Sequence, residues 1–289
     1  MMNPKEIDSL IKLLDDPDAS VFEAIRIKLN QLGLAVIPSL EKAWENNLDS
    51  LFQSRIENII DDIYQNDVKD QLNQWIKTEA HDLIEAALII AKFQYHELNI
   101  QELKEQIEKI KKDIWLELND NLTALEKIKI INHIVFDIHK FSRSNTFQNS
   151  AQSNFINHLL ENRKGSPIIL AVLYAGLCQQ LNLPVFGVAL PKNFILCYKD
   201  PHKQVFENEP NEGVLFYINP FNKGVVFGKK EIDQFIKQQK LENKAAYFQA
   251  STNLDTIVLL LKSIIVYYEL NAEKTKAENY QALLKILYF

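Results

Sequence analysis

Residues 154–198 decide the fold of this chain, and they read NFINHLLENRKGSPIILAVLYAGLCQQLNLPVFGVALPKNFILCY. Gly165 ends a first predicted helix, and Ser166 followed by Pro167 is a start signal for a second. A serine side chain caps the free backbone N–H groups, and a proline at the first helical position loses no hydrogen bond. Residues 168–181 are apolar on nearly every side, which is typical of a helix that other elements cover.

Sequence rich in β-formers follows this helix. Val185–Leu190 and Phe194–Tyr198 are predicted as two strands separated by a Pro-Lys break. A capped helix that leads into an antiparallel sheet is a position where an enzyme could hold a nucleophile. Farther along, the sequence predicts a short edge strand, two more strands and a helix, at Gln204–Phe206, Val214–Ile218, Val225–Phe227 and Lys229–Gln239.

Helical periodicity fills the rest of the chain. In residues 1–78, paired amphipathic helices and a Leu-Leu-Asp-Asp-Pro-Asp string at 13–18 resemble a HEAT repeat unit, with a plain helical bundle as the alternative. Residues 246–289 are predicted as a helical hairpin similar to one tetratricopeptide unit. The remaining predicted helices are Leu48–Tyr64, Val68–Ile76, Leu83–Tyr95, Ile100–Leu118 and Thr123–Phe141, the last with a capping-box spacing at its start.

Over roughly residues 80–245 the chain resembles the bacterial transglutaminase-like proteins of the SirB type. Their pattern has an Asn before a leucine-rich helix, Arg-x-Gly-x-Pro-Ile, a Leu and a Tyr, a Gly-Leu-Pro turn, Pro-Gly-His-Phe and Asp-Pro-Phe. The chain departs from it where Lys192-Asn193 replaces Gly-His, Asn219 replaces the Asp and Asn182 replaces the Gly of the turn. The matching residues are Asn154, Arg163, Gly165, Pro167, Ile168, Leu173, Tyr174, Leu183, Pro184, Gly187, Val188, Pro191, Phe194, Pro220 and Phe221.

The resemblance implies a mostly helical α+β fold. Its core would be a transglutaminase/cysteine-protease-like domain, in which a buried central helix packs on a small antiparallel sheet. We therefore expect three regions: an N-terminal HEAT-like helical region at 1–78, the transglutaminase-like domain at 79–245 and the C-terminal helical hairpin at 246–289.

The resemblance also implies where catalytic residues would stand. In transglutaminase-like folds a cysteine at the start of the buried helix is the nucleophile, a histidine on a following strand activates it, and an aspartate on the next strand orients the histidine. Carried onto this chain, these positions fall at or next to Pro167, at Asn193 and at Asn219. Proline carries no nucleophile, and an asparagine amide neither titrates near neutral pH nor bears a charge. The sequence therefore favours a catalytically degenerate binding, scaffold or regulatory module.

An alternative interpretation is an enzyme, either a hydrolase or an acyl transferase, or a small-ligand binder that uses the residual cleft. Helix capping explains Ser166, whereas Cys197 shares a strand face with Asn193 if the strand alternates regularly. Arg163 either binds a carboxylate or phosphate ligand or pairs with a structural partner within the chain. Asn193 and Asn219 either hold helix and sheet together through amide hydrogen bonds or bind a ligand.

Composition bounds the class of protein. The 289 residues are 47% hydrophobic and 24% charged, as in ordinary globular proteins. A net charge of −6 argues against a general nucleic-acid binder, which needs clustered Lys and Arg. We expect no signal peptide, no membrane span and no disulfide framework from the two cysteines, and hence a cytoplasmic protein.

No metal site or cofactor is expected from the histidines. His133 and His139 are six residues apart, which places them on different sides of a helix, and no Cys or carboxylate cluster completes a ligand set. The partners that we expect are proteins bound through the helical regions. The sequence does not identify those partners or the oligomeric state.

Overall fold

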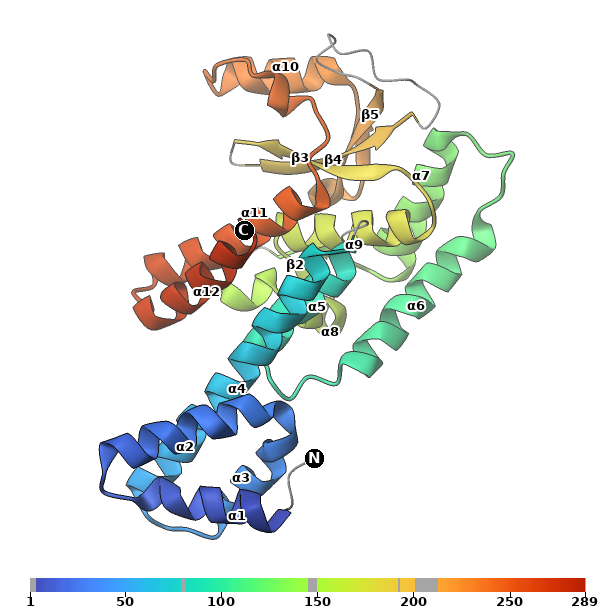
Figure 1. Ribbon diagram of the computed structural model, residues 1–289. Helices are drawn as coiled ribbons and strands as arrows, with labels where there is room; N and C mark the ends of the chain where they lie inside the picture. Colours follow the sequence, from blue (N-terminus) through green and yellow to red (C-terminus); the bar gives the residue numbers. More distant parts are fainter. Residues whose placement is uncertain (1–3, 79–81, 145–149, 192, 201–212, 289) are drawn as a thin grey trace. The chain divides into compact units, whose positions relative to one another are not determined.

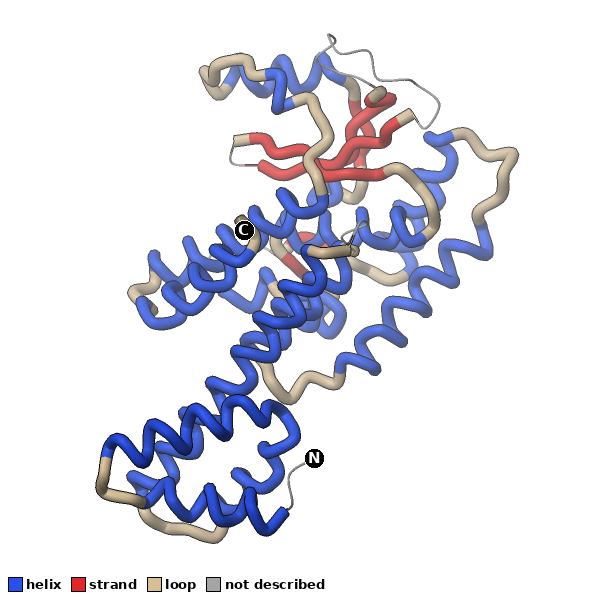
Figure 2. The backbone as a smooth tube through the Cα atoms, viewed as in Figure 1, coloured by secondary structure: helices blue, strands red, loops and turns tan. Residues whose placement is uncertain are grey.

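The computed structural model describes residues 4–78, 82–144, 150–191, 193–200 and 213–288. The chain forms two compact units, Met1–Gln74 with Lys92–His96, and Trp75–Ala91 with Glu97–Phe289. Helices predominate in both units, and the four-stranded sheet lies in the second (Figures 1 and 2). None of the described helices is both long enough and apolar enough to cross a membrane.

The first unit is helical. Asp18 caps its second helix by accepting a hydrogen bond from the Ser20 N–H, and Gly33 ends that helix with φ of +63°. The predicted break between Tyr64 and Val68 is wrong, because the helix there is continuous. The three intervening residues include no glycine or proline, and buried side chains flank them at Ile63 and Val68. The helices are α1 (Pro4–Lys12), α2 (Ala19–Leu32), α3 (Ile37–Glu45) and α4 (Ser50–Ile76).

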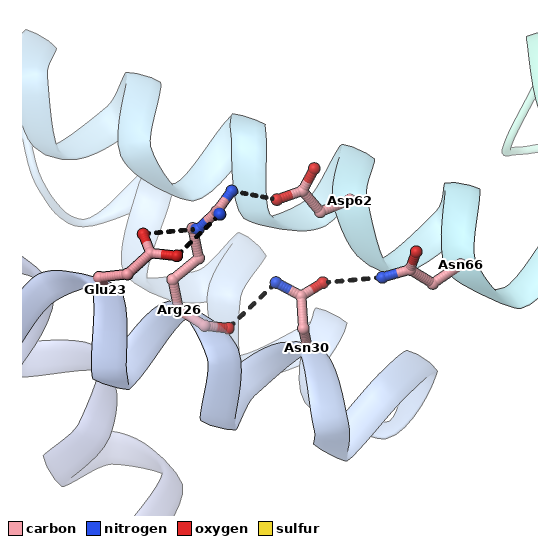
Figure 3. Close-up of polar contacts among 5 residues, drawn as sticks. All are labelled: Glu23, Arg26, Asn30, Asp62 and Asn66. Atoms are coloured by element: carbon pink, nitrogen blue, oxygen red, sulfur yellow. Dashed lines mark hydrogen bonds and ion pairs between the residues drawn. The ribbon is translucent and has the colours of Figure 1, made fainter. Parts of the chain in front are cut away.

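Polar contacts connect α2 to α4 (Figure 3). The Arg26 guanidinium lies between two carboxylates, with 2.9 Å from Nη2 to Glu23 and 2.9 Å from Nη1 to Asp62. One turn on, the Asn66 amide donates to the Asn30 side chain at 3.4 Å. These groups therefore pair with one another across the two helices. Whether the unit is a HEAT repeat or a plain bundle stays a prediction.

Helices of the second unit precede the stretch that decides the fold. The predicted helix 123–141 begins at a capping box formed by Thr123 and Glu126, as expected. Its α-helical part ends earlier than predicted, at Asn132, and a π-helical turn at His133–Ile138 follows. The helices are α5 (Leu83–Gln94), α6 (Ile100–Glu117) and α7 (Ala124–Asn132).

The central helix α9 (Pro167–Gln180) starts where the sequence predicts. The preceding helix α8 (Ile156–Asn162) begins after a 3-10 turn at 151–154, and it ends at Arg163, whose φ is +59°. Gly165 is required because a Cβ there would lie 2.7 Å from Ile169 Cγ2. Every residue of α9 from Ile168 to Cys178 is buried, so other elements cover it on all sides.

The sheet has the order β3-β4-β5-β6, and every neighbouring pair is antiparallel. Helix α9 contacts β3 and β4 on one face of the sheet, and α10 (Lys229–Gln238) packs on the opposite face (Figure 1). A short parallel pair, β1 (Ser142–Arg143) with β2 (Lys164–Gly165), precedes α9. The predicted edge strand Gln204–Phe206 lies outside the described residues. The strands are β3 (Val185–Leu190), β4 (Asn193–Lys199), β5 (Val214–Asn219) and β6 (Val225–Phe227).

Two helices end the chain, α11 (Asn253–Leu270) and α12 (Lys274–Ile286). They pack against each other, with the rings of Tyr268 and Tyr280 stacked at 5.6 Å between centroids. Helix α11 also contacts α9 and β3, so it belongs to the second compact unit. The three-region division at residues 78 and 245 stays a prediction, because compactness does not test whether a region folds independently.

Candidate functional site

The start of α9 opens onto a cavity of about 880 Å³. Three of the six candidate site residues, Ser166, Pro167 and Asn193, line it. The described lining is mostly apolar, which suits a small-molecule or peptide ligand. Its residues are Asn154, Ser166, Pro167, Ile168, Ala189, Leu190, Asn193, Phe194, Leu259, Lys262, Ser263, Val266, Tyr267 and Leu270.

The polar groups of Ser166, at the helix start, hydrogen-bond to backbone groups. The Ser166 Oγ accepts from the Ile169 N–H at 3.5 Å, and the Ser166 N–H donates to the Ser153 carbonyl at 2.8 Å. Pro167 stands at the first helical position and has neither a side-chain nucleophile nor an N–H. Ser166 therefore acts as a cap, and no described histidine hydrogen-bonds to its hydroxyl.

The two asparagines hold local backbone geometry. Asn193 begins β4, and its Oδ1 accepts from the Phe194 N–H at 3.0 Å. Asn219 ends β5, and its Oδ1 accepts from the Asn222 N–H at 3.3 Å, which caps a 3-10 turn. Because Leu196 pairs with Ile218, these asparagines lie at the same end of adjacent antiparallel strands. Asn193 lines the cavity, whereas Asn219 is not among its described lining residues.

A hydrogen-bond chain fixes the turn after Asn219. The buried Tyr174 hydroxyl donates to the Asn132 Oδ1 at 2.7 Å, and the Asn132 amide donates to the Gly224 carbonyl at 2.7 Å. The Gly224 N–H in turn donates to the Asn219 carbonyl at 2.9 Å. The middle of α9 thereby positions the end of β5.

Cys197 lies away from the cavity. It is buried with Ile195 and Tyr217 in the cluster that packs under Ile232 and Ile236 of α10. Burial raises the pKa of its thiol to about 12, against an opposing effect of Lys199. Cys178 is buried inside α9, and burial raises its pKa far above the usual value. At neutral pH both thiols are protonated and poor nucleophiles.

Arg163 is also outside the described lining of the cavity. Its carbonyl accepts from the Ser142 N–H at 2.8 Å, and its guanidinium carbon lies 4.9 Å from the centre of the Phe141 ring. Burial lowers the pKa of the guanidinium, and Nη1 has no hydrogen-bond partner among the described residues. The Arg163 main chain thus joins β2 to β1, while its side chain covers an aromatic ring.

The histidines contact separate carboxylates. His133 Nδ1 lies 3.2 Å from Asp137, and His139 Nε2 lies 2.8 Å from Asp113. In the part of the chain that the structure describes, no three His, Cys, Asp or Glu side chains gather as a metal site would require.

Helix α11 supplies a wall of the cavity that the sequence did not point to. Leu259, Val266 and Leu270 face the cavity, and Lys262 is the one charged residue in its described lining. Val266 and Leu270 are 50% and 81% exposed. These large apolar residues of α11 lie outside its buried face. Their spacing of seven and four residues was the available signal.

Comparison with known proteins places this region in a family context. The sequence model described as "Transglutaminase-like superfamily" matches residues 101–262, more than half of the chain. The match runs from α6 into α11 and includes Pro167, Asn193 and Asn219. No solved structure matches the chain significantly.

The chain is also similar to several curated proteins. A "UPF0162 protein" of Xylella fastidiosa (strain 9a5c) is 21% identical over 162 residues, which are 56% of this chain and 54% of that protein. A "UPF0162 protein" of Buchnera aphidicola subsp. Baizongia pistaciae is 26% identical over 123 residues, 43% of this chain and 40% of the relative. "F-box only protein 21" of Mus musculus is 27% identical over 112 residues, 37% of this chain and 17% of the relative. The chain thus spans about half, or less, of the length of these relatives.

Proposed function

This chain belongs to the transglutaminase-like superfamily, and we propose that it is a catalytically degenerate member of the SirB type that acts as a binding, scaffold or regulatory module. The observation that carries the proposal is the set of residues at the three positions that would hold the nucleophile, base and orienting group. They are Pro167 at the start of α9, Asn193 at the start of β4 and Asn219 at the end of β5.

The chemistry of these residues supports the proposal. A helix start favours a thiolate, but Pro167 has no thiol and the Ser166 hydroxyl is engaged as a cap. An amide at Asn193 can neither take nor return a proton during acyl transfer. Both cysteines are buried elsewhere with raised pKa values. No described group at the cavity therefore supplies an activated nucleophile.

A cavity of about 880 Å³ favours the second candidate, a small-ligand binder that uses the residual cleft. An enzyme acting there, whether hydrolase or acyl transferase, would need a nucleophile that the described lining lacks. We propose that protein partners bind through the helical regions, which the sequence predicts to resemble HEAT and tetratricopeptide units. The two unpaired cysteines support a reducing compartment, which we take to be the cytoplasm.

Assays of thiol-dependent activity test the proposal. The full chain and its Cys178→Ser and Cys197→Ser variants would be incubated with a panel of amide, ester and thioester substrates. We expect no turnover above a heat-denatured control in any of the three. Activity that disappears in Cys197→Ser, with thermal unfolding unchanged, would make Cys197 the nucleophile and overturn the non-catalytic assignment.

A further inference from the structure

The cavity at the start of α9 has two walls that come from distant parts of the sequence. Ile168, Leu190 and Phe194 contribute apolar surface from α9 and the sheet, and Val266 and Leu270 contribute it from α11. The two α11 residues are exposed beside the cavity rather than packed in the core. Apolar surface that is exposed next to a cavity of this size indicates a binding site for an apolar group.

One edge of the sheet borders this cavity. Among the described strands β3 pairs only with β4, so its other edge has no strand partner in the part of the chain that the structure describes. The Lys199 N–H donates to the Pro184 carbonyl at 2.8 Å, which shows that the even-numbered residues of β3 bond to β4. The odd-numbered residues Val185, Gly187 and Ala189 therefore aim their N–H and C=O groups away from β4.

Other parts of the chain donate to the outward carbonyls of two of these three residues. The Val185 carbonyl accepts from the Gln179 amide at 2.8 Å, and the Gly187 carbonyl accepts from the Ser251 N–H at 2.7 Å. The third, Ala189, lies in the wall of the cavity, and no described residue hydrogen-bonds to its outward groups. A donor and an acceptor on a strand edge are the groups with which an extended peptide pairs.

The charge of the cavity selects among peptides. Lys262 supplies a cation, and no carboxylate is present in the described lining. The Lys262 Nζ lies 5.9 Å from the centre of the Tyr288 ring and forms no ion pair with a described carboxylate. A ligand with a negative charge would gain a favourable contact there without displacing a carboxylate from Lys262.

We propose that this cavity binds an extended peptide segment in which an acidic side chain is flanked by apolar ones. The peptide main chain pairs with Ala189, its apolar side chains contact Val266 and Leu270, and its carboxylate pairs with Lys262. The inference rests on the proposed function, since it gives the non-catalytic module its ligand class.

Two peptide pools test this assignment. Both contain N-acetylated, C-amidated pentapeptides with Leu, Ile, Val or Phe at the outer four positions, and the central residue is Glu in one pool and Gln in the other. Capping both termini excludes a terminal carboxylate as the source of the charge. On the immobilised full chain, we expect the Glu pool to be retained about three- to tenfold better, as for one exposed charged contact.

Substitutions in the chain test which residues cause the preference for the Glu pool. Lys262→Gln should abolish the preference for Glu, whereas the matched control Lys109→Gln, on α6 and outside this cavity, should retain it. Ala189→Pro removes the outward N–H on an edge strand, where proline is tolerated, and should weaken both pools about tenfold. If that variant unfolds in circular dichroism, Nα-methylation of the central peptide residue tests the reciprocal hydrogen bond, from the peptide N–H to the Ala189 carbonyl, in the native chain.

Equal retention of the two pools, retention of neither pool, or a Glu preference that survives Lys262→Gln would overturn the inference. Retention of sodium decanoate but of neither pool would identify an acyl carboxylate as the ligand and also overturn it. In each of these cases the proposed non-catalytic function is unaffected, provided that the chain shows no turnover of the amide, ester and thioester substrates. Cleavage of a retained peptide would instead overturn the proposed function itself.

Discussion

At the scale of single residues, burial decides what the two thiols can do. The Cys178 and Cys197 side chains are both fully buried, one inside α9 and one under α10. Desolvation disfavours the charged thiolate and so raises both pKa values, that of Cys197 to about 12. The stretch of β4 that carries Cys197 is therefore a packing element.

The rate of thiol alkylation measures how far Cys178 and Cys197 are ionised and accessible. In the native chain at about pH 8, we expect iodoacetamide to modify Cys178 and Cys197 roughly a thousandfold more slowly than in urea, because almost no thiolate is present. Peptide mapping by mass spectrometry gives the rate for each site. Rapid labelling of Cys197 in the folded chain would show that it is reachable and ionised.

A second prediction at the residue scale concerns Ser166, the cap of α9. Ser166→Ala removes the acceptor for the Ile169 N–H and should lower the free energy of unfolding by about 0.5–2 kcal/mol, measured by urea denaturation. Thr252→Ala is the matched control, since it removes the cap of α11, where Oγ1 accepts from the Asp255 N–H at 3.0 Å. Loss of peptide binding in Ser166→Ala at unchanged stability would contradict a purely capping role.

At the scale of elements, α9 organises the second unit. It contacts α8, α11, β3 and β4, and it is buried from Ile168 to Cys178. Gly176 allows α5 to approach closely, because a Cβ there would lie 2.5 Å from Ile84 Cγ1. A helix covered in this way determines where the sheet and α11 lie, and so it determines the shape of the cavity at its start.

Truncation in the middle of this helix should be costly. Leu173 is 1% exposed, so Leu173→Ala leaves a cavity and should cost about 2–5 kcal/mol in the free energy of unfolding. Leu125, which is 40% exposed on α7, is the matched control, and its alanine variant should cost less than about 1 kcal/mol. A loss below about 1 kcal/mol for Leu173→Ala would mean that α9 is not central.

At the scale of the whole molecule, each of the two compact units has its own core. In the first, Leu14, Leu29 and Leu40 are fully buried among α1 to α4. The second is built on α9 and the sheet. Separate cores allow one unit to open locally while the other keeps its hydrogen bonds.

Hydrogen exchange tests this independence. Leu29→Ala should speed amide exchange in α1 to α3 and leave the protection of β3 and β4 unchanged, as followed by mass spectrometry of peptic fragments. Because Leu29 is 0% exposed, the substitution leaves a cavity in the first core. A uniform loss of protection across both units would show that the chain opens as a single cooperative body.

The sequence by itself determined the start of α9 and the two strands, β3 and β4, that follow it. Local signals suffice for these features, because the Ser166 cap, Pro167 and the alternation of β3 and β4 act over a few residues. Through the resemblance, the sequence also predicted that proline and asparagine occupy the three expected catalytic positions. Local signals did not decide whether α4 is one helix or two, since propensity around Asn66 is neutral and packing settles it.

Only the tertiary structure decided which side chains form the site. Alternation along β4 gives two faces, but the packing of α9 and α10 determines which one each helix covers, and that packing places Cys197 under α10. The wall with Lys262, Val266 and Leu270 lies far along the chain from Pro167. Contacts between such distant segments depend on the three-dimensional path of the chain, which no local pattern encodes. The sequence therefore predicted the positions that the resemblance assigns, whereas the cavity and its charge appeared only when α11 packed beside α9 and β3.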